Sequence, residues 1–317
     1  MEQPRVDYET AQRLFSSRKF SEALKILDFL ISSSSLEVEP KARVHNLRGL
    51  IYEEDCRWDD ARTEYNKAID LQPNFAIAYY NRGYLLEDRY QLYEDALRDY
   101  TKAIELNPSH NKSFHNRAIL LRNHFGKWQE ALEDINRAIA ISPDNANHHT
   151  NKGILLLYHF KQYEEALQEF NISDNPSLKS LTYTFMGELQ DSAYWLDRAE
   201  RTRRTSLLPY VRARLLQARG EIQPAIQNYA KYLKQVAGQE HLLYIYMRDA
   251  RKQMRNLLMK NILSWKIERV LWLGQIKEDE ETCLIACLPK EILKLIVQFL
   301  KEDLYTTTAA LTIKNAF

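Results

Sequence analysis

The sequence contains one segment three times, at a fixed spacing of 35 residues. The segment that begins at Asn81 returns at Asn116 and at Asn151, each time followed by a basic residue and then by a small residue. Fifteen residues beyond each asparagine stands an alanine: Ala96, Ala131 and Ala166. A fixed period between about 20 and 50 residues is typical of a stacked array of similar units rather than of one globular core.

The composition favours helices as the repeated units. A chain of 317 residues has room for two ordinary domains, or for one solenoid with an appendage. It holds only 8 glycines and 9 prolines, few for an architecture rich in β-turns. Its 45% of hydrophobic residues is enough for a packed core. We therefore expect an all-α chain.

Weaker copies extend the array in both directions. Upstream, Gly49, Ala61 and Pro73 mark a fourth copy whose first loop is one residue shorter. Looser copies follow the spacing of Ala11 and Ala23, and of Ala213 and Ala225. Small residues such as Gly83 and Ala96 are expected where paired helices touch, with Tyr100 on the apolar stripe of the second helix. Pro108 is expected to end that helix.

Each copy resembles a tetratricopeptide repeat, because the small, aromatic and proline positions recur in register. The resemblance covers residues 1–237, as six to seven repeats that are clearest at 41–178. It implies antiparallel helix pairs in a right-handed superhelical solenoid. A pentatricopeptide repeat, which reads RNA, would lack the ending from Ala103 to Pro108.

A surface of the first helices is the predicted binding site. In the three clear copies, positions four residues apart form one stripe per helix. The stripes contain Tyr80, Tyr84 and Asp88; His115, Ile119 and Asn123; and Thr150, Ile154 and Tyr158. In superhelical members of the family, this face lines the concave side. We call these residues the first-helix stripe, and we expect them to contact an extended peptide or protein segment.

The three asparagines run beside this stripe. In family members that hold peptides, an asparagine at the matching position forms a ladder along the groove. A carboxamide offers both a donor and an acceptor, which a peptide backbone can use whatever its side chains are. Asn81, Asn116 and Asn151 are therefore predicted to contact the ligand. The alternative is that they brace neighbouring helices within the array.

The basic residues after these asparagines have two interpretations. Arg82, Arg117 and Lys152 either pair with acids of the adjacent repeat or meet an acidic ligand. Family members that clamp the C-terminal carboxylates of chaperones need a lysine on the stripe, four residues before an asparagine. Tyr80, His115 and Thr150 stand at that position, so no such clamp is expected.

The segment 198–269 supports a different function, that of a basic helical scaffold for RNA or an anionic membrane. Residues 179–275 hold 17 Lys and Arg against 8 Asp and Glu, a balance of +9. The patch consists of Arg198, Arg201, Arg203, Arg204, Arg212 and Arg214. Aromatic residues that could stack on bases, such as Trp195, stand nearby. The alternative is a solvated helix face.

The C-terminal part is expected to hold two helical elements. Residues 238–274 are predicted to form amphipathic helices that cap the apolar end of the solenoid. Residues 275–317 are predicted to form a short helical tail. This tail resembles the first half of an F-box, a segment that docks on the Skp-type adaptor of ubiquitin ligases. The matching residues are Leu288, Pro289, Glu291, Ile292, Ile296 and Leu300. The usual second half is missing, and any short packing helix would use similar residues.

Nothing in the sequence predicts catalysis, a metal or a cofactor. Phosphate-binding glycine loops and hydrolase signatures are missing. The sparse Cys56, Cys283 and Cys287 favour a reducing, cytoplasmic compartment over a disulfide framework. No run of about 18 apolar residues predicts a membrane span. The residues leave open delivery to another cell by a route that needs no signal peptide.

Overall fold

The computed structural model describes residues 7–32, 38–202, 206–236 and 246–258, and all regular structure within these ranges is helical. The chain divides into two compact units, Met1–Arg251 and Lys252–Phe317. The first unit contains the array. Of the second unit only residues 252–258 are described, as a helix. The F-box-like residues 288–300 and Cys283 and Cys287 lie outside the described residues.

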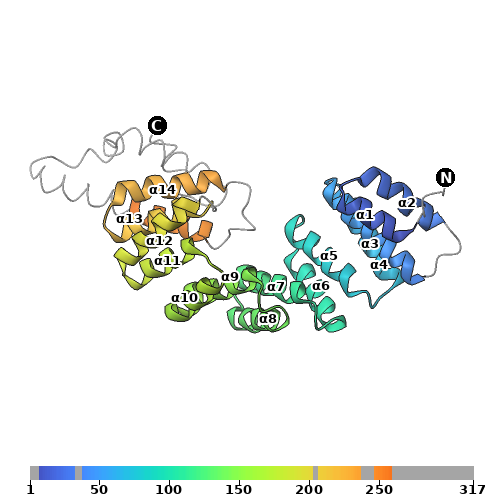
Figure 1. Cartoon of the computed structure of the whole chain (residues 1–317), viewed down its shortest axis with the longest axis horizontal. Coiled ribbons are helices and arrows are strands. Elements are labelled where there is room, and N and C mark those ends of the chain that lie inside the picture. The colour runs from blue at the N-terminus through green and yellow to red at the C-terminus, as the bar shows by residue number, and fades with distance from the viewer. Residues whose placement is uncertain (1–6, 33–37, 203–205, 237–245, 259–317) are drawn as a thin grey trace, which may run out of the picture. The chain divides into compact units, whose positions relative to one another are not determined.

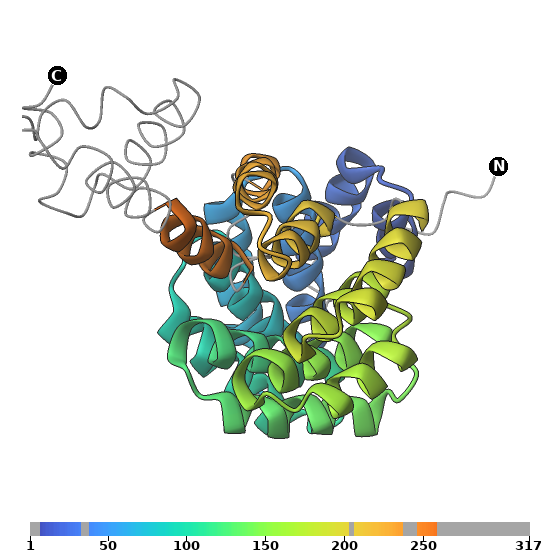
Figure 2. The same cartoon turned by 90° about the vertical axis from the view of Figure 1, so that its left-hand side faces the viewer.

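The array is a series of antiparallel helix pairs in chain order, each packed on the next (Figure 1). The first helices of successive pairs are α1 (Tyr8–Ser16), α3 (Val38–Glu54), α5 (Ala76–Asp88), α7 (Asn111–Leu120), α9 (Ala146–Leu155), α11 (Pro176–Met186) and α13 (Leu208–Ala218). The second helices are α2 (Phe20–Ser32), α4 (Trp58–Leu71), α6 (Tyr93–Leu106), α8 (Trp128–Ile141), α10 (Tyr163–Ile172), α12 (Leu189–Thr202) and α14 (Ile222–Gln235). Figure 2 shows the green helices of residues 111–172 side by side from a second direction.

Small residues bring the two helices of a pair together, as predicted. A Cβ atom added to Gly83 would come within 3.2 Å of the Tyr100 ring. The same approach is closer at Gly153, where the added Cβ would lie 2.4 Å from Cε1 of Phe170. Ala96 and Tyr100 are fully buried, and α6 ends at Leu106 before Pro108.

Helix-turn-helix repeats of this kind usually have 34 residues, whereas the copies here are 35 residues apart. A local change in helix winding accommodates the extra residue. In two copies the first helix ends in a π-helical turn, η1 (Leu121–Phe125) and η2 (Leu156–Phe160). A π-turn holds one more residue than an α-turn. The chain then reverses through a residue in the left-handed region: Gly126 has φ 64° and Lys161 has φ 56°.

Stacked rings join each repeat to the next. The aromatic residue that begins a second helix meets a side chain at the end of the following first helix. Tyr93 stacks on His124 with ring centroids 3.6 Å apart, and Trp128 stacks on His159 at 4.6 Å. The guanidinium of Arg89 lies 4.2 Å from the Trp58 ring in the same way. These histidines are therefore packing residues of the repeat.

A further helix, residues 246–258, follows the array. Within the first unit, its residue Tyr246 packs edge-on against Tyr158, with ring centroids 5.7 Å apart. Asp249 accepts a hydrogen bond from the Tyr210 hydroxyl at 2.6 Å. Residues 246–258 lie within the segment 238–274 and are helical; the capping of the array by this segment stays a prediction.

Candidate functional site

In three repeats a buried acid on the second helix holds the basic residue of the same repeat. Arg82 donates two hydrogen bonds to Asp99, both 2.7 Å long, and Arg117 donates two to Asp134, both 2.8 Å long. Lys152 lies 2.7 Å from Glu169. The sequence left open whether these cations pair with acids of the adjacent repeat or meet an acidic ligand; in the structure each pairs with the acid of its own helix pair. They are not free to bind an acidic ligand.

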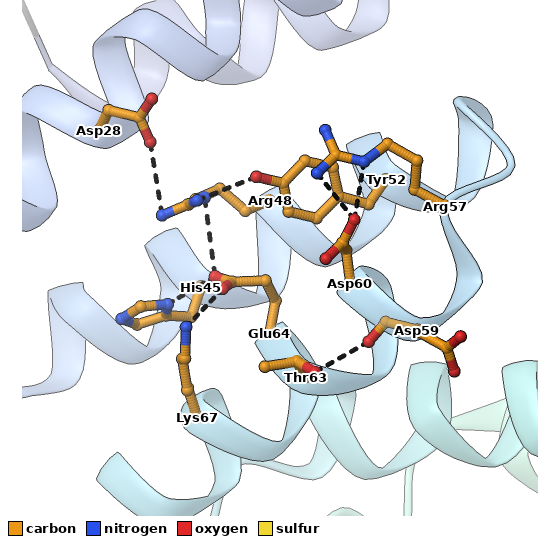
Figure 3. A network of polar contacts seen from close by, with 10 residues as sticks. All are labelled: Asp28, His45, Arg48, Tyr52, Arg57, Asp59, Asp60, Thr63, Glu64 and Lys67. Atoms are coloured by element: carbon orange, nitrogen blue, oxygen red, sulfur yellow. Dashed lines mark hydrogen bonds and ion pairs between the residues drawn. The ribbon is translucent and has the colours of Figure 1, made fainter.

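In two repeats a histidine of the first helix also contacts the buried acid, and Figure 3 shows this arrangement for Glu64. Glu64 accepts from Nδ1 of His45 at 2.7 Å and from Nζ of Lys67 at 2.9 Å, and it lies 3.6 Å from Nε of Arg48. Burial raises the pKa of this carboxyl, but the hydrogen bonds from His45 and Lys67 and the charge of Arg48 bring it below its ordinary value. Glu64 is therefore a charged anchor inside the repeat.

The asparagines connect successive repeats. Asn81 is buried and donates from Nδ2 to Oδ1 of Asn46, 2.9 Å away in the preceding repeat. Asn116 is half-buried and donates to the hydroxyl of Tyr80 at 3.3 Å. The same position thus reaches back by one repeat in both copies. These donors brace the array, and peptide contact through the remaining acceptor atoms stays a prediction.

The third asparagine has a different partner. Oδ1 of Asn151 accepts from Nη1 of Arg122 at 3.0 Å, and its Nδ2 donates to the carbonyl of Asn147 at 3.1 Å. Arg122 and Asn46 are site residues that the sequence reasoning missed. The sequence held a signal for Arg122: the acidic Glu87 at this position of one repeat is replaced by the basic Arg122 in the next.

The first-helix stripe is open in its early copies. Tyr84 is 43% exposed, with Tyr80 half-buried on one side of it. On the other side Asp88 pairs with Arg89 at 2.9 Å. In the next copy, Ile119 and Asn123 are half-buried. An exposed tyrosine suits contact with a peptide surface that has both apolar and polar groups, because its ring is apolar and its hydroxyl is polar.

A pair of histidines lies in this second copy of the stripe. Nδ1 of His115 is 2.8 Å from Nδ1 of His148, and their ring centroids are 4.8 Å apart. Burial lowers the pKa of His115 to about 4, and the positive charges of His148 and Arg122 act in the same direction. His115 is therefore neutral at neutral pH.

The last copy of the stripe is covered by the chain itself. Ile154 is buried, and the hydroxyl of Tyr158 is 2.8 Å from that of Tyr210. The Tyr158 ring also meets Tyr246 of the helix after the array. The structure thus encloses Tyr158 in a cluster of tyrosines and buries Ile154, whereas Tyr84 of the first copy is exposed.

The basic patch is largely paired within the described residues. Arg201 lies 2.7 Å from Asp197, and Arg212 forms an ion pair with Glu200. Arg214 is in the interior, 3.4 Å from Asp249. Arg198 stacks on Trp195 at 5.3 Å. Arg203 and Arg204 lie outside the described residues, so binding of RNA or an anionic membrane by this segment stays a prediction.

No group of histidine, cysteine, aspartate and glutamate in the described part of the chain is arranged to hold a metal ion. Cys56 is a free, exposed thiol. None of the helices within the described ranges combines the length and apolar character that crossing a bilayer requires.

Comparisons with known proteins agree with this geometry. The family profile described as "TPR repeat" matches residues 57–88, and that described as "Tetratricopeptide repeat" matches 90–146 and 125–175. No curated protein sequence matches the chain.

Two solved structures are similar in fold. A tetratricopeptide repeat protein from Parabacteroides merdae has a TM-score of 0.56 at 17% identity, over 71% of this chain and 90% of its own. PilF of Pseudomonas aeruginosa has a TM-score of 0.55 at 17% identity, over 63% of this chain and 91% of its own. The matching profiles identify tetratricopeptide repeats within residues 57–175, and the recurring helix pairs have the fold of these two solved structures.

Proposed function

We propose that the chain is a non-catalytic scaffold that binds an extended peptide or protein segment along the first-helix stripe. The repeats support a protein-interaction role in general. The observation that carries the finer proposal is the contrast along the stripe. Tyr84 is 43% exposed and Ile119 and Asn123 are half-buried. In the last copy of the stripe, by contrast, Ile154 is buried and Tyr158 contacts Tyr210 and Tyr246.

The asparagines contribute in a restricted way under this proposal. The donor of Asn81 is committed to Asn46, and that of Asn116 to Tyr80. Each carboxamide oxygen has no hydrogen-bond partner among the described residues and remains an acceptor for a peptide N–H. These two carboxamides would therefore set the register of a segment whose affinity comes from the side chains of the stripe.

The experiment uses a displayed library of random extended peptides, selected on the full chain, and then the affinity of each selected peptide for variants. Tyr84→Ala combined with Ile119→Ala is expected to weaken binding at least about tenfold, since each loses an apolar contact. Tyr194→Ala is the matched control, because Tyr194 is 60% exposed on the second helix α12. Equal loss in the control, or none in the double variant, would contradict the proposal.

The coupling to a ubiquitin-ligase adaptor remains a separate part of this proposal. It depends on the F-box-like residues 288–300, which lie outside the described residues. Capture of an Skp-type adaptor by the full chain, but not by Leu288→Ala with Ile292→Ala, would support it. Equal capture by both chains, or by neither, would end it.

A further inference from the structure

One buried guanidinium in the array has no carboxylate partner among the residues that the structure describes. Arg122 lies in η1 and is 9% exposed. Its Nε donates to Oδ1 of Asn123 and its Nη1 to Oδ1 of Asn151, both at 3.0 Å. Its remaining nitrogen, Nη2, makes no hydrogen bond to the described residues, and no ion pair includes Arg122 there. A buried charge that is not met by an opposite charge is unfavourable.

The repeat itself does not require a charge at this position. In two earlier copies a glutamate stands there and accepts a hydrogen bond from a tyrosine hydroxyl: Glu53 from Tyr65 and Glu87 from Tyr100. In the copy of Arg122 the tyrosine is replaced by Ile135, which offers no polar atom. The next copy has the apolar pair Leu157 and Phe170. Packing within the repeat therefore does not account for Arg122.

The side chains on which the charge of Arg122 acts include one buried hydroxyl and two histidines. Its charge acts on Tyr246, whose hydroxyl is buried and has no hydrogen-bond partner. It also acts on His115 and, together with Arg248, on His159. His148, which contacts His115, has a buried Nε2 without a partner. Within the described residues, neither ion pairs nor charge interactions join Arg122 to a carboxylate.

We propose that Arg122, with the hydroxyl of Tyr246 as a second donor, binds an oxyanion that supplies the missing negative charge. A carboxylate or phosphate oxygen would accept from Nη2 and from the tyrosine hydroxyl. Asn123 and Asn151 hold the guanidinium in place through Nε and Nη1. A planar guanidinium fixed in this way has its remaining N–H groups oriented for an oxyanion.

The oxyanion has two possible sources with the same chemistry. One is a free small anion. The other is an acidic side chain of a segment bound along the first-helix stripe, since Ile119 and Asn123 of that stripe are close to Arg122 in the sequence and Asn123 is bonded to it. The second source rests on the proposed function, whereas the first does not.

The first experiment measures thermal unfolding of the full chain at fixed ionic strength with rising inorganic phosphate or glutarate. The wild type is expected to melt higher as either oxyanion is added, and Arg122→Met is expected to lose this response. Arg117→Met is the matched control, because Arg117 stands five residues earlier and is paired with Asp134. It should melt lower but keep the response. A response in Arg122→Met equal to that of the wild type would overturn the proposal.

A second variant changes the site without removing its charge. Tyr246→Phe deletes only the unpartnered hydroxyl, so the fold is kept, and oxyanion affinity is expected to fall about tenfold for one lost hydrogen bond to a charged group. Unchanged affinity for both phosphate and glutarate would show that the hydroxyl is not a donor to the anion and would refute the site as described.

A third experiment, with peptides, separates the two sources of the oxyanion. Peptides selected on the wild type are compared with copies in which Glu and Asp are replaced by Gln and Asn. A preference for the acidic copies that disappears in Arg122→Met assigns the oxyanion to the bound segment. Response to free oxyanions alone assigns a small-anion site. Peptide binding that needs Tyr84, with no acidic preference and no oxyanion response, would retain the proposed function and reject this inference.

Discussion

Replacing Gly153 by alanine should destabilise the array, and a second substitution taken from a neighbouring repeat should restore it. The added Cβ would lie 2.4 Å from Cε1 of Phe170, although ordinary contacts begin near 3.4 Å. The Phe170 ring must move by about an ångström within a core where it is fully buried. In the preceding copy, alanine and isoleucine, Ala118 and Ile135, stand at these two positions.

The expected magnitude combines two opposing effects. Overpacking of this kind costs about 1–3 kcal/mol, whereas alanine gains about 1 kcal/mol over glycine inside a helix. A contact of 2.4 Å is far inside the ordinary distance, so the cost of overpacking should be about 2–3 kcal/mol, and Gly153→Ala is expected to lower the free energy of unfolding by about 1–2 kcal/mol. Phe170→Ile alone should lower it by about 1–2 kcal/mol through lost contacts. The double variant should be nearer to the wild type than the sum of the two predicts, with a coupling of about 1–2 kcal/mol.

The assay is urea unfolding of all four chains, followed by circular dichroism, with the slope of free energy against urea compared between chains. Gly83→Ala is the control, because its added Cβ would stay 3.1 Å or more from its nearest neighbours, Asp99 and Tyr100. It should be close to neutral. If Gly153→Ala is as stable as the wild type, or if the coupling is near zero, the close-approach explanation of this glycine is wrong.

Three further predictions test the braces, the turns and a buried acid. Asp134→Asn should destabilise by about 3 kcal/mol in the same assay, because it leaves Arg117 half-buried without its partner, whereas Asp95→Asn at an exposed pair should change stability by about 1 kcal/mol or less. Lys161→Gly should stabilise and Gly126→Ala destabilise, each by about 1 kcal/mol, because both residues have positive φ in equivalent turns; shifts of the same sign would contradict this. Burial raises the pKa of Glu87 to about 7 from 4.5, so the folded chain keeps a proton that the unfolded chain releases. The stability from Glu87 is therefore complete below about pH 4.5 and is lost as pH rises through about 7; Glu87→Gln should remove this part of a pH-stability profile, and exposed Glu94→Gln should not.

The three copies of the first-helix stripe differ in exposure although their sequences are in the same register. Spacing places Tyr84 and Tyr158 at related positions of their helices, yet Tyr84 is exposed and Tyr158 is enclosed by Tyr210 and Tyr246. The difference comes from a segment far along the chain, which no local pattern relates to Tyr158. A repeat pattern predicts which face a residue occupies but not what covers that face.

The sequence by itself determined the period, the helix pairs, the close approach at Gly83 and Gly153, and the end of α6 before Pro108. These features depend on local spacing, on side-chain size and on the backbone of proline, all of which are fixed by neighbouring residues. The sequence also indicated the stripe, because positions four residues apart share one side of a helix.

Only the tertiary structure decided how the polar groups pair. Arg117 joins Asp134 in its own repeat, and Asn81 joins Asn46 one repeat earlier. Within the described ranges, Arg122 contacts two amide oxygens and no carboxylate. Each outcome depends on which helix brings an acceptor within about 3 Å, a distance that follows from packing and not from spacing along the chain.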